Sequence, residues 1–113
     1  EERIELIQKL KRRYRTFLLS NTNEMHYKKY TKDFRKQFGF ELNSLFEKTY
    51  YSFKKNMKKP DGKFFIKIIE ANNLNPNETL FIDDTEIHIK SAQKTGIQTF
   101  HLTNGKTIND ILW

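Results

Sequence analysis

Short apolar segments alternate along this chain with segments of helical periodicity, and this alternation constrains the fold more than any other feature. Four β-prone segments are expected to form strands, namely Thr16–Leu19, Lys48–Ser52, Thr79–Ile82 and Ile97–Leu102. Five helical segments surround them, namely 2–13, Glu24–Phe38, 61–72, Thr85–Thr95 and Ile108–Trp113. Because strands that alternate with helices over short connections usually pair in parallel, the pattern predicts an α/β fold with a mostly parallel sheet.

The composition fits one globular domain over residues 1–113. Hydrophobic residues make up 36% of the chain and charged residues 31%, which is enough apolar material for a core. No apolar run approaches the roughly 20 residues that cross a bilayer, and the charged start of the chain does not resemble a signal peptide. The sequence has no cysteine, which is typical of a reducing compartment, so we expect a cytoplasmic location and no membrane partner.

The positive charge is concentrated in the first part of the chain. Residues 1–67 hold 18 of the 21 Lys and Arg with 8 acidic residues, whereas residues 68–113 hold 3 basic and 6 acidic residues. A basic half can bind nucleic acid or an anionic substrate, or it can be a solvated surface, which is the commonest outcome for scattered lysines. The bases accompany no recognised reader motif, so nucleic acid is not the expected partner. We expect core or sheet-edge positions, rather than a base-stacking platform, for Tyr50, Tyr51 and Phe53.

Two of the expected strands are followed by conspicuous polar pairs. Ser20 and Asn21 follow one strand, and Asp83 and Asp84 follow another. In a parallel sheet both pairs would lie at the same edge, where ligands bind in α/β proteins. Adjacent carboxylates repel each other unless a cation, a hydrogen-bond donor or solvent relieves them.

Each of these features also has a plainer explanation when it is taken alone. Ser20 and Asn21 can cap a helix, and Asp83 and Asp84 can form a turn and an N-cap. Lys59 lies in a lysine-rich run and can be a solvated surface residue. The histidines show no metal-ligand spacing, so surface or partly buried positions are expected for His26, His88 and His101.

Three segments occur in an order that is more informative than any one of them. They are FLLSNTN, then MKKPDGKFF, then TLFIDDTEIHIKSAQKTGIQTFHL. In this order they resemble the second, third and fourth motifs of the haloacid dehalogenase-like (HAD) hydrolases, and especially the small sugar-phosphate phosphatases. The resemblance implies a three-layer, Rossmann-like core and a Mg²⁺-dependent phosphatase that acts on a phosphorylated small metabolite. Dehalogenase activity is a less favoured alternative.

The resemblance also implies roles for five residues. Ser20 would bind the phosphate through its hydroxyl group, and Asn21 through its backbone N–H. Lys59 would hold the phosphate and screen an attacking carboxylate, which makes it the one catalytic residue that we name. Asp83 and Asp84 would bind Mg²⁺, which prefers hard oxygen ligands and retains several waters. This arrangement suits phosphoryl transfer, because the transferred group needs donors and positive charge around its oxygens.

The first motif of the family has no counterpart in these residues. That motif is an apolar strand that ends in Asp-x-Asp or Asp-x-Gly, and no apolar strand ends at Asp33, Asp61 or Asp110. The helical cap is also missing. The resemblance therefore implies an incomplete core without its central first strand and cap. We expect the C-terminal portion of a longer enzyme that needs its own N-terminal segment, and we name no nucleophile.

A non-catalytic function remains open. A degenerate relative of the family would bind a phosphorylated ligand or a partner protein without turnover. The isolated 113-residue chain is expected to be inactive in either case, because no attacking carboxylate is identified in it.

Overall fold

The structure, a computed structural model, describes residues 2–52, 62–103 and 105–111. These residues fall into two units, Glu1–Asn56 and Met57–Trp113, which are taken here one at a time. The expectation of a single domain over residues 1–113 is not tested by this division and stays a prediction. The positions predicted for Phe53, Lys59 and Asp61 lie outside the described residues.

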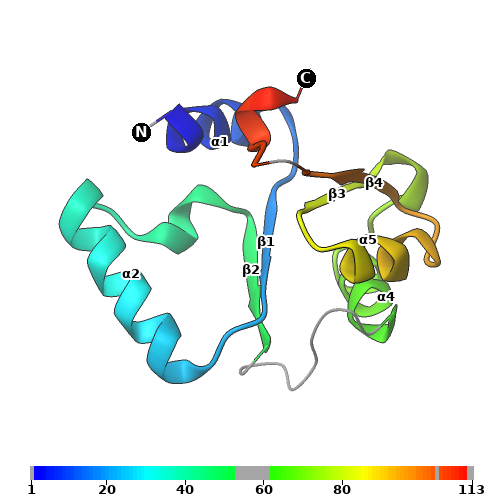
Figure 1. The fold of residues 1–113 in the computed structure, drawn as a ribbon, viewed down its shortest axis with the longest axis horizontal. Helices are drawn as coiled ribbons and strands as arrows, with labels where there is room; N and C mark the ends of the chain where they lie inside the picture. The colour runs from blue at the N-terminus through cyan, green and yellow to red at the C-terminus, as the bar shows by residue number, and fades with distance from the viewer. Residues whose placement is uncertain (1, 53–61, 104, 112–113) are drawn as a thin grey trace. The chain divides into compact units, whose positions relative to one another are not determined.

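The first unit is a helix followed by a strand–helix–strand segment (Figure 1). Its elements are α1 (Glu2–Arg13), β1 (Phe17–Ser20), α2 (Glu24–Phe38), the 3₁₀ turn η1 (Leu42–Leu45) and β2 (Lys48–Tyr51). The two strands pair in parallel, with Phe17 opposite Lys48 at one end and Ser20 opposite Tyr51 at the other. The predicted parallel pairing is therefore present in this unit.

Both ends of α2 have well-defined caps. The side chain of Asn23 accepts a hydrogen bond of 2.8 Å from the backbone N–H of His26 at the helix start. At the other end, Gly39 adopts φ 80° and donates its N–H to Arg35 O at 2.8 Å. A left-handed residue of this kind is usually glycine, and the helix ends at Phe38, as the expected range Glu24–Phe38 has it.

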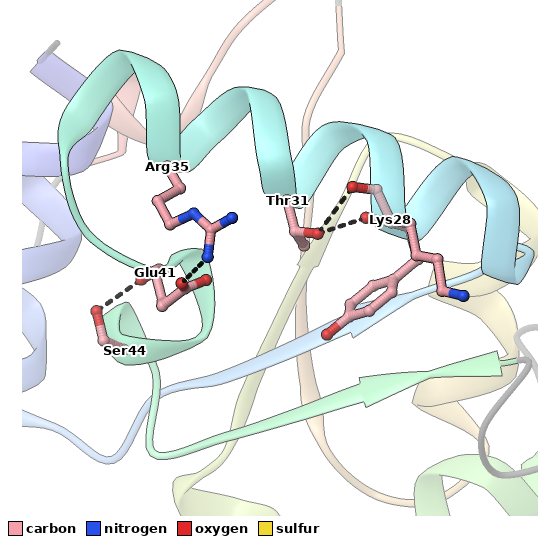
Figure 2. A network of polar contacts seen from close by, with 6 residues as sticks. Lys28, Thr31, Arg35, Glu41 and Ser44 are labelled. Carbon is pink, nitrogen blue, oxygen red and sulfur yellow. Dashed lines mark hydrogen bonds and ion pairs between the residues drawn. The ribbon is translucent and has the colours of Figure 1, made fainter.

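Polar contacts join α2 to the turn η1 (Figure 2). Arg35 Nη1 lies 3.1 Å from Glu41 Oε1, and Ser44 Oγ donates to Glu41 O at 2.6 Å. Within the helix, Thr31 Oγ1 donates to Tyr27 O at 2.7 Å. The contact between Arg35 and Glu41 links the end of α2 to the start of η1.

The core of the first unit is aromatic. Tyr51 is only 1% exposed, and its ring centroid lies 4.5 Å from that of Tyr27. Its hydroxyl group donates to Asn43 Oδ1 at 2.7 Å, and burial raises the pKa of this phenol above its ordinary value. Tyr50 and Leu45 are also buried. The core positions predicted for Tyr50 and Tyr51 are confirmed.

The second unit contains another parallel strand–helix–strand segment (Figure 1). Its elements are α4 (Gly62–Ala71), η2 (Pro76–Glu78), β3 (Leu80–Asp83), α5 (Glu86–Gln93), β4 (Gln98–His101) and η3 (Ile108–Asp110). Leu80 pairs with Gln98 at one end of the two strands, and Asp83 pairs with His101 at the other.

Helices α4 and α5 supply most of the buried side chains of the second unit. Phe65 is buried on α4, and its ring centroid lies 4.9 Å from that of Phe81 on β3. Phe64 and Ile68 complete the buried face of α4, as the apolar periodicity predicts. From α5, the buried residues are Ile89 and Ala92.

The end of the chain differs from the sequence expectation. A helix was expected over Ile108–Trp113, but the described part is a single 3₁₀ turn, Ile108–Asp110. Thr107 caps this turn, because its hydroxyl accepts from Asn109 N while its own N–H donates to Asp110 Oδ2 at 2.7 Å. The backbone is extended at Ile111, so the turn does not continue as a helix.

Each strand has one strand neighbour within the described residues, β1 with β2 and β3 with β4. All four residues of β1 are only partly buried, although three of them are the apolar Phe17, Leu18 and Leu19. In β3, Leu80 is 42% exposed. Two parallel pairs with incompletely covered apolar residues agree with the incomplete sheet expected from the sequence.

No helix in the described part of the chain is long and apolar enough to cross a membrane.

Candidate functional site

The aspartate pair lies where β3 ends and the chain turns toward α5. Asp83 is the last residue of β3, and its carbonyl accepts a hydrogen bond of 2.9 Å from Leu102 N. Asp84 is exposed, and one of its carboxylate oxygens accepts from Thr85 Oγ1 at 3.1 Å. The N-cap position of α5 belongs to Thr85 and not to either aspartate. The geometry therefore places the pair where the strand ends and the turn begins, and it removes helix capping as the explanation of the pair.

Two histidines contact the aspartate pair. His88 Nδ1 lies 2.7 Å from Asp83 Oδ2, and both side chains are 16% exposed. His101 Nε2 lies 3.0 Å from the backbone oxygen of Asp84. Carboxylate and carbonyl oxygens accept hydrogen bonds, so we assign a proton to Nδ1 of His88 and to Nε2 of His101.

The sequence did not reveal these contacts. His88 and His101 are partly buried, as expected, but metal-ligand spacing is the wrong signal for a residue that binds a carboxylate. The sequence signal that could have revealed these contacts is the position of each histidine relative to Asp83. His88 lies in the first turn of the helix that follows Asp83, and His101 ends the neighbouring strand in register with it.

The aspartate pair fits part of a magnesium site. Two adjacent carboxylates supply the hard oxygen ligands that Mg²⁺ prefers, and the ion usually keeps several waters. The described residues contain no cluster of three or more His, Cys, Asp or Glu that could hold a metal.

The Ser20–Asn21 pair lies at the end of β1 and in the loop that follows. Ser20 ends the strand opposite Tyr51, and Asn21 is exposed. The N-cap of α2 is Asn23, so helix capping does not explain the residue types at Ser20 and Asn21. The backbone N–H of Asn21 precedes that cap by two residues.

A serine after β2 holds the same loop. Thr22 N donates to Ser52 Oγ at 2.9 Å, and Ser52 Oγ donates in turn to Thr22 O at 2.9 Å. Both bonds are partly buried. Ser52 thus fixes the backbone two residues after Ser20, which the sequence analysis did not foresee.

The grouping of the predicted site residues stays a prediction. Ser20 and Asn21 belong to the first unit, and Asp83 and Asp84 belong to the second. Lys59 lies outside the described residues. What the structure does place is each pair at the carboxyl end of a parallel strand.

Parallel strand–helix–strand segments with polar residues at the carboxyl ends of their first strands define an α/β protein of the class that binds ligands at that edge. The family model of the haloacid dehalogenase-like hydrolases matches residues 1–102, and the chain belongs to that family.

Similar proteins of known structure or function agree with this assignment. A D-ribitol-5-phosphate phosphatase from Bacteroides thetaiotaomicron is 31% identical over 103 residues, which are 91% of this chain and 50% of the relative. A HAD family enzyme of the same organism is 38% identical with a TM-score of 0.88, over 96% of this chain and 53% of that one. Its wild-type complex with magnesium and inorganic phosphate gives a TM-score of 0.87 at 38% identity, over 95% and 54%.

A further solved structure, a HAD-like family hydrolase from Porphyromonas gingivalis, is 34% identical with a TM-score of 0.85, over 93% of this chain and 51% of that one. The chain thus spans about half the length of the relatives that it matches. The resemblance and the fold class inferred from the three ordered motifs are confirmed.

Proposed function

We propose that the full-length protein is a Mg²⁺-dependent phosphatase that acts on a phosphorylated small metabolite, with a sugar or sugar-alcohol phosphate as the substrate class. The observation that carries the proposal is the Asp83–Asp84 turn at the carboxyl end of a parallel strand in a chain of this family. Support comes from a relative that is a D-ribitol-5-phosphate phosphatase and from a similar enzyme solved with magnesium and inorganic phosphate.

In this proposal each of the five predicted residues has a role in binding the metal or the phosphate. Asp83 and Asp84 hold Mg²⁺, which supplies positive charge to the transferred phosphoryl group. The hydroxyl of Ser20 and the N–H of Asn21 donate hydrogen bonds to phosphate oxygens, and Lys59 adds positive charge there. The attacking carboxylate is expected from a segment outside these 113 residues, and no residue of this chain is assigned that role.

The test uses the full-length protein and measures phosphate release from a panel of sugar and sugar-alcohol phosphates, with and without Mg²⁺. Asp83→Asn and Asp84→Asn should each lower the Mg²⁺-dependent rate by about 100-fold or more, which is typical for loss of one electrostatic contact to the transition state. Asp33→Asn makes the same chemical change at an exposed position of α2, and it should leave the rate unchanged.

The outcomes separate the two functions. Unchanged rates in both active-site variants would exclude the metal role of the aspartate pair. Mg²⁺ and phosphate binding without turnover of any substrate by the wild-type protein would instead support the non-catalytic, ligand-binding alternative.

A further inference from the structure

We propose that His88 is a positioning residue for Asp83 and sets the affinity of the aspartate pair for Mg²⁺ by holding the Asp83 carboxylate in one orientation. The inference rests on the proposed function and deepens it. Its physical basis is the 2.7 Å contact between His88 Nδ1 and Asp83 Oδ2.

Burial makes this contact important for the carboxylate. Both side chains are 16% exposed, so little solvent is available to Asp83 as a source of hydrogen bonds. A carboxylate that is largely removed from water needs protein donors to remain charged and ordered. The ring of His88 supplies one such donor at Oδ2. Because a carboxylate has about four lone-pair sites, the bond uses only part of what Asp83 can offer as an acceptor.

The backbone holds both partners of the contact in place. Asp83 is the last residue of β3 and is paired with His101, whereas His88 lies in the first turn of α5. His88 N donates to Thr85 O at 3.1 Å, which fixes the start of the helix that carries the ring. Because the contact already restricts the carboxylate of Asp83, Mg²⁺ has less side-chain motion to restrict when it binds, which lowers the entropic cost of binding.

His101 fixes the next residue of the same turn. Its Nε2 lies 3.0 Å from Asp84 O, so one histidine contacts a side chain of the pair and another contacts its backbone. Hydrogen-bond partners behind metal ligands typically affect metal affinity by about 10- to 100-fold. We assign the direct effect to His88, because it contacts a carboxylate oxygen.

A purely structural role must be distinguished from positioning. The bond between Asp83 and His88 also ties β3 to α5, so its loss can weaken the fold without any effect specific to Mg²⁺. Replacing His88 by side chains whose donors lie at different distances from Cβ separates the two roles. Nδ1 of histidine and Nδ2 of asparagine are both bonded to Cγ, so asparagine can place a donor at nearly the same point. The donor of glutamine lies one bond further out.

The experiment compares His88→Asn, His88→Gln and His88→Leu in the full-length protein. Calorimetry measures the dissociation constant of Mg²⁺ without substrate, and thermal unfolding monitors the fold. The Asn variant should bind Mg²⁺ within a few-fold of wild type, while Gln and Leu should weaken binding by about 10- to 100-fold. Ile87→Ala, at an exposed neighbour on the same helix turn, is the matched control and should bind Mg²⁺ as wild type does.

The affinities of the His88 variants for Mg²⁺ decide between positioning and a purely structural role. If the Leu variant fails to fold, the comparison of Asn with Gln decides, because both retain an amide. Equal Mg²⁺ affinity in the Asn and Gln variants, or a Leu variant that binds as tightly as wild type, would overturn the inference while leaving the phosphatase proposal intact. A wild-type protein that binds no Mg²⁺ would overturn both.

Imidazole nitrogen NMR provides a second readout that does not depend on the metal. In the metal-free full-length protein, His88 should carry its proton on Nδ1, and Asp83→Asn should change that signal. A neutral His88 ring that is protonated only on Nε2 would contradict the donor role on which the inference depends.

Discussion

The hydroxyl group of Ser52 makes two hydrogen bonds to the backbone of Thr22 and so ties the loop after Ser20 to the end of β2. The two bonds, each 2.9 Å long, join residues that are 30 positions apart in the sequence. One bond accepts from Thr22 N and the other donates to Thr22 O, so both backbone groups depend on a single side chain. The loop that follows Ser20 carries Asn21, whose N–H is proposed to bind phosphate. Its conformation therefore depends on Ser52, a residue outside the loop.

Replacing Ser52 with alanine should loosen that loop in the full-length protein. The partly buried N–H and C=O of Thr22 would lose their partner, at a cost of about 1–3 kcal/mol of stability for a buried group left unsatisfied. KM for the phosphorylated substrate and the inhibition constant of inorganic phosphate should both rise. Ser52→Thr keeps the hydroxyl and should retain more affinity.

Ser44→Ala is the matched control for that experiment, because Ser44 Oγ also donates to a backbone oxygen, that of Glu41, but at an exposed turn. It should leave both constants unchanged. Wild-type phosphate affinity and stability in Ser52→Ala would show that the loop does not depend on this hydroxyl.

The starts of β1 and β2 are joined by an ion pair with good geometry. Arg15 Nη2 lies 2.6 Å from Glu47 Oε2, and Arg15 Nε donates to Glu47 Oε1 at 3.0 Å. Next to it, Glu47 N donates to Thr16 O at 2.8 Å. The hydrogen bond from Arg15 holds the pKa of the Glu47 carboxyl below its ordinary value. Because both side chains remain substantially exposed, the contribution to stability is small and is screened by salt.

The lowered pKa fixes the sign of a pH effect on stability. A carboxyl whose pKa is lower in the folded state stabilises the fold above its unfolded pKa, and this stabilisation is lost as the pH falls through the folded pKa. Glu47→Gln should therefore reduce the free energy of unfolding slightly at pH 7, and the difference from wild type should shrink as the pH falls below about 4.3. Urea denaturation at several pH values, in low and high salt, measures it.

Glu70→Gln, at an exposed position of α4, is the control for the ion pair. It should change the free energy of unfolding at pH 7 less than Glu47→Gln does. A Glu47→Gln difference that is constant from pH 7 to pH 3 would contradict the assignment of the effect to the pair with Arg15.

The elements were largely predictable, and the bounds of α1 and α2 are those expected, whereas the ends of the strands were not predicted to the residue. The expected strands Thr16–Leu19 and Thr79–Ile82 each lie one residue later in the structure, so that Ser20 and Asp83 are strand residues. Side-chain polarity suggested that the strands stop earlier, but the backbone ladder extends to both residues regardless of their side chains. The single 3₁₀ turn at Ile108–Asp110 was missed for a related reason, since an apolar ending does not specify whether a turn continues as a helix.

For the whole molecule, the order of three motifs carried more information than any residue. Ser20, Lys59 and Asp83 each had an ordinary explanation alone, but their order predicted the family that the comparison then showed. The contacts made by His88 and Ser52 could not be predicted in this way. They join residues from different elements, and only the folded backbone specifies which side chains meet.

The length of the match leads to a prediction about the 113-residue chain by itself. It covers about half of its relatives, and β1 has one strand neighbour among the described residues. Phe17, Leu18 and Leu19 are only partly buried there, and a strand edge with incompletely buried apolar residues favours association with another chain. The isolated chain should therefore unfold with low cooperativity, bind hydrophobic dyes and release no phosphate in Mg²⁺.

The full-length protein is the reference for this comparison. It should unfold cooperatively, bind less dye and hydrolyse a phosphorylated substrate, because an additional segment would cover the apolar strand and supply the attacking carboxylate. Dye fluorescence, urea denaturation and phosphate release, measured on both chains at equal concentration, check the expectation together. Cooperative unfolding with robust Mg²⁺-dependent turnover by the 113-residue chain would mean that it contains its own nucleophile and a complete core.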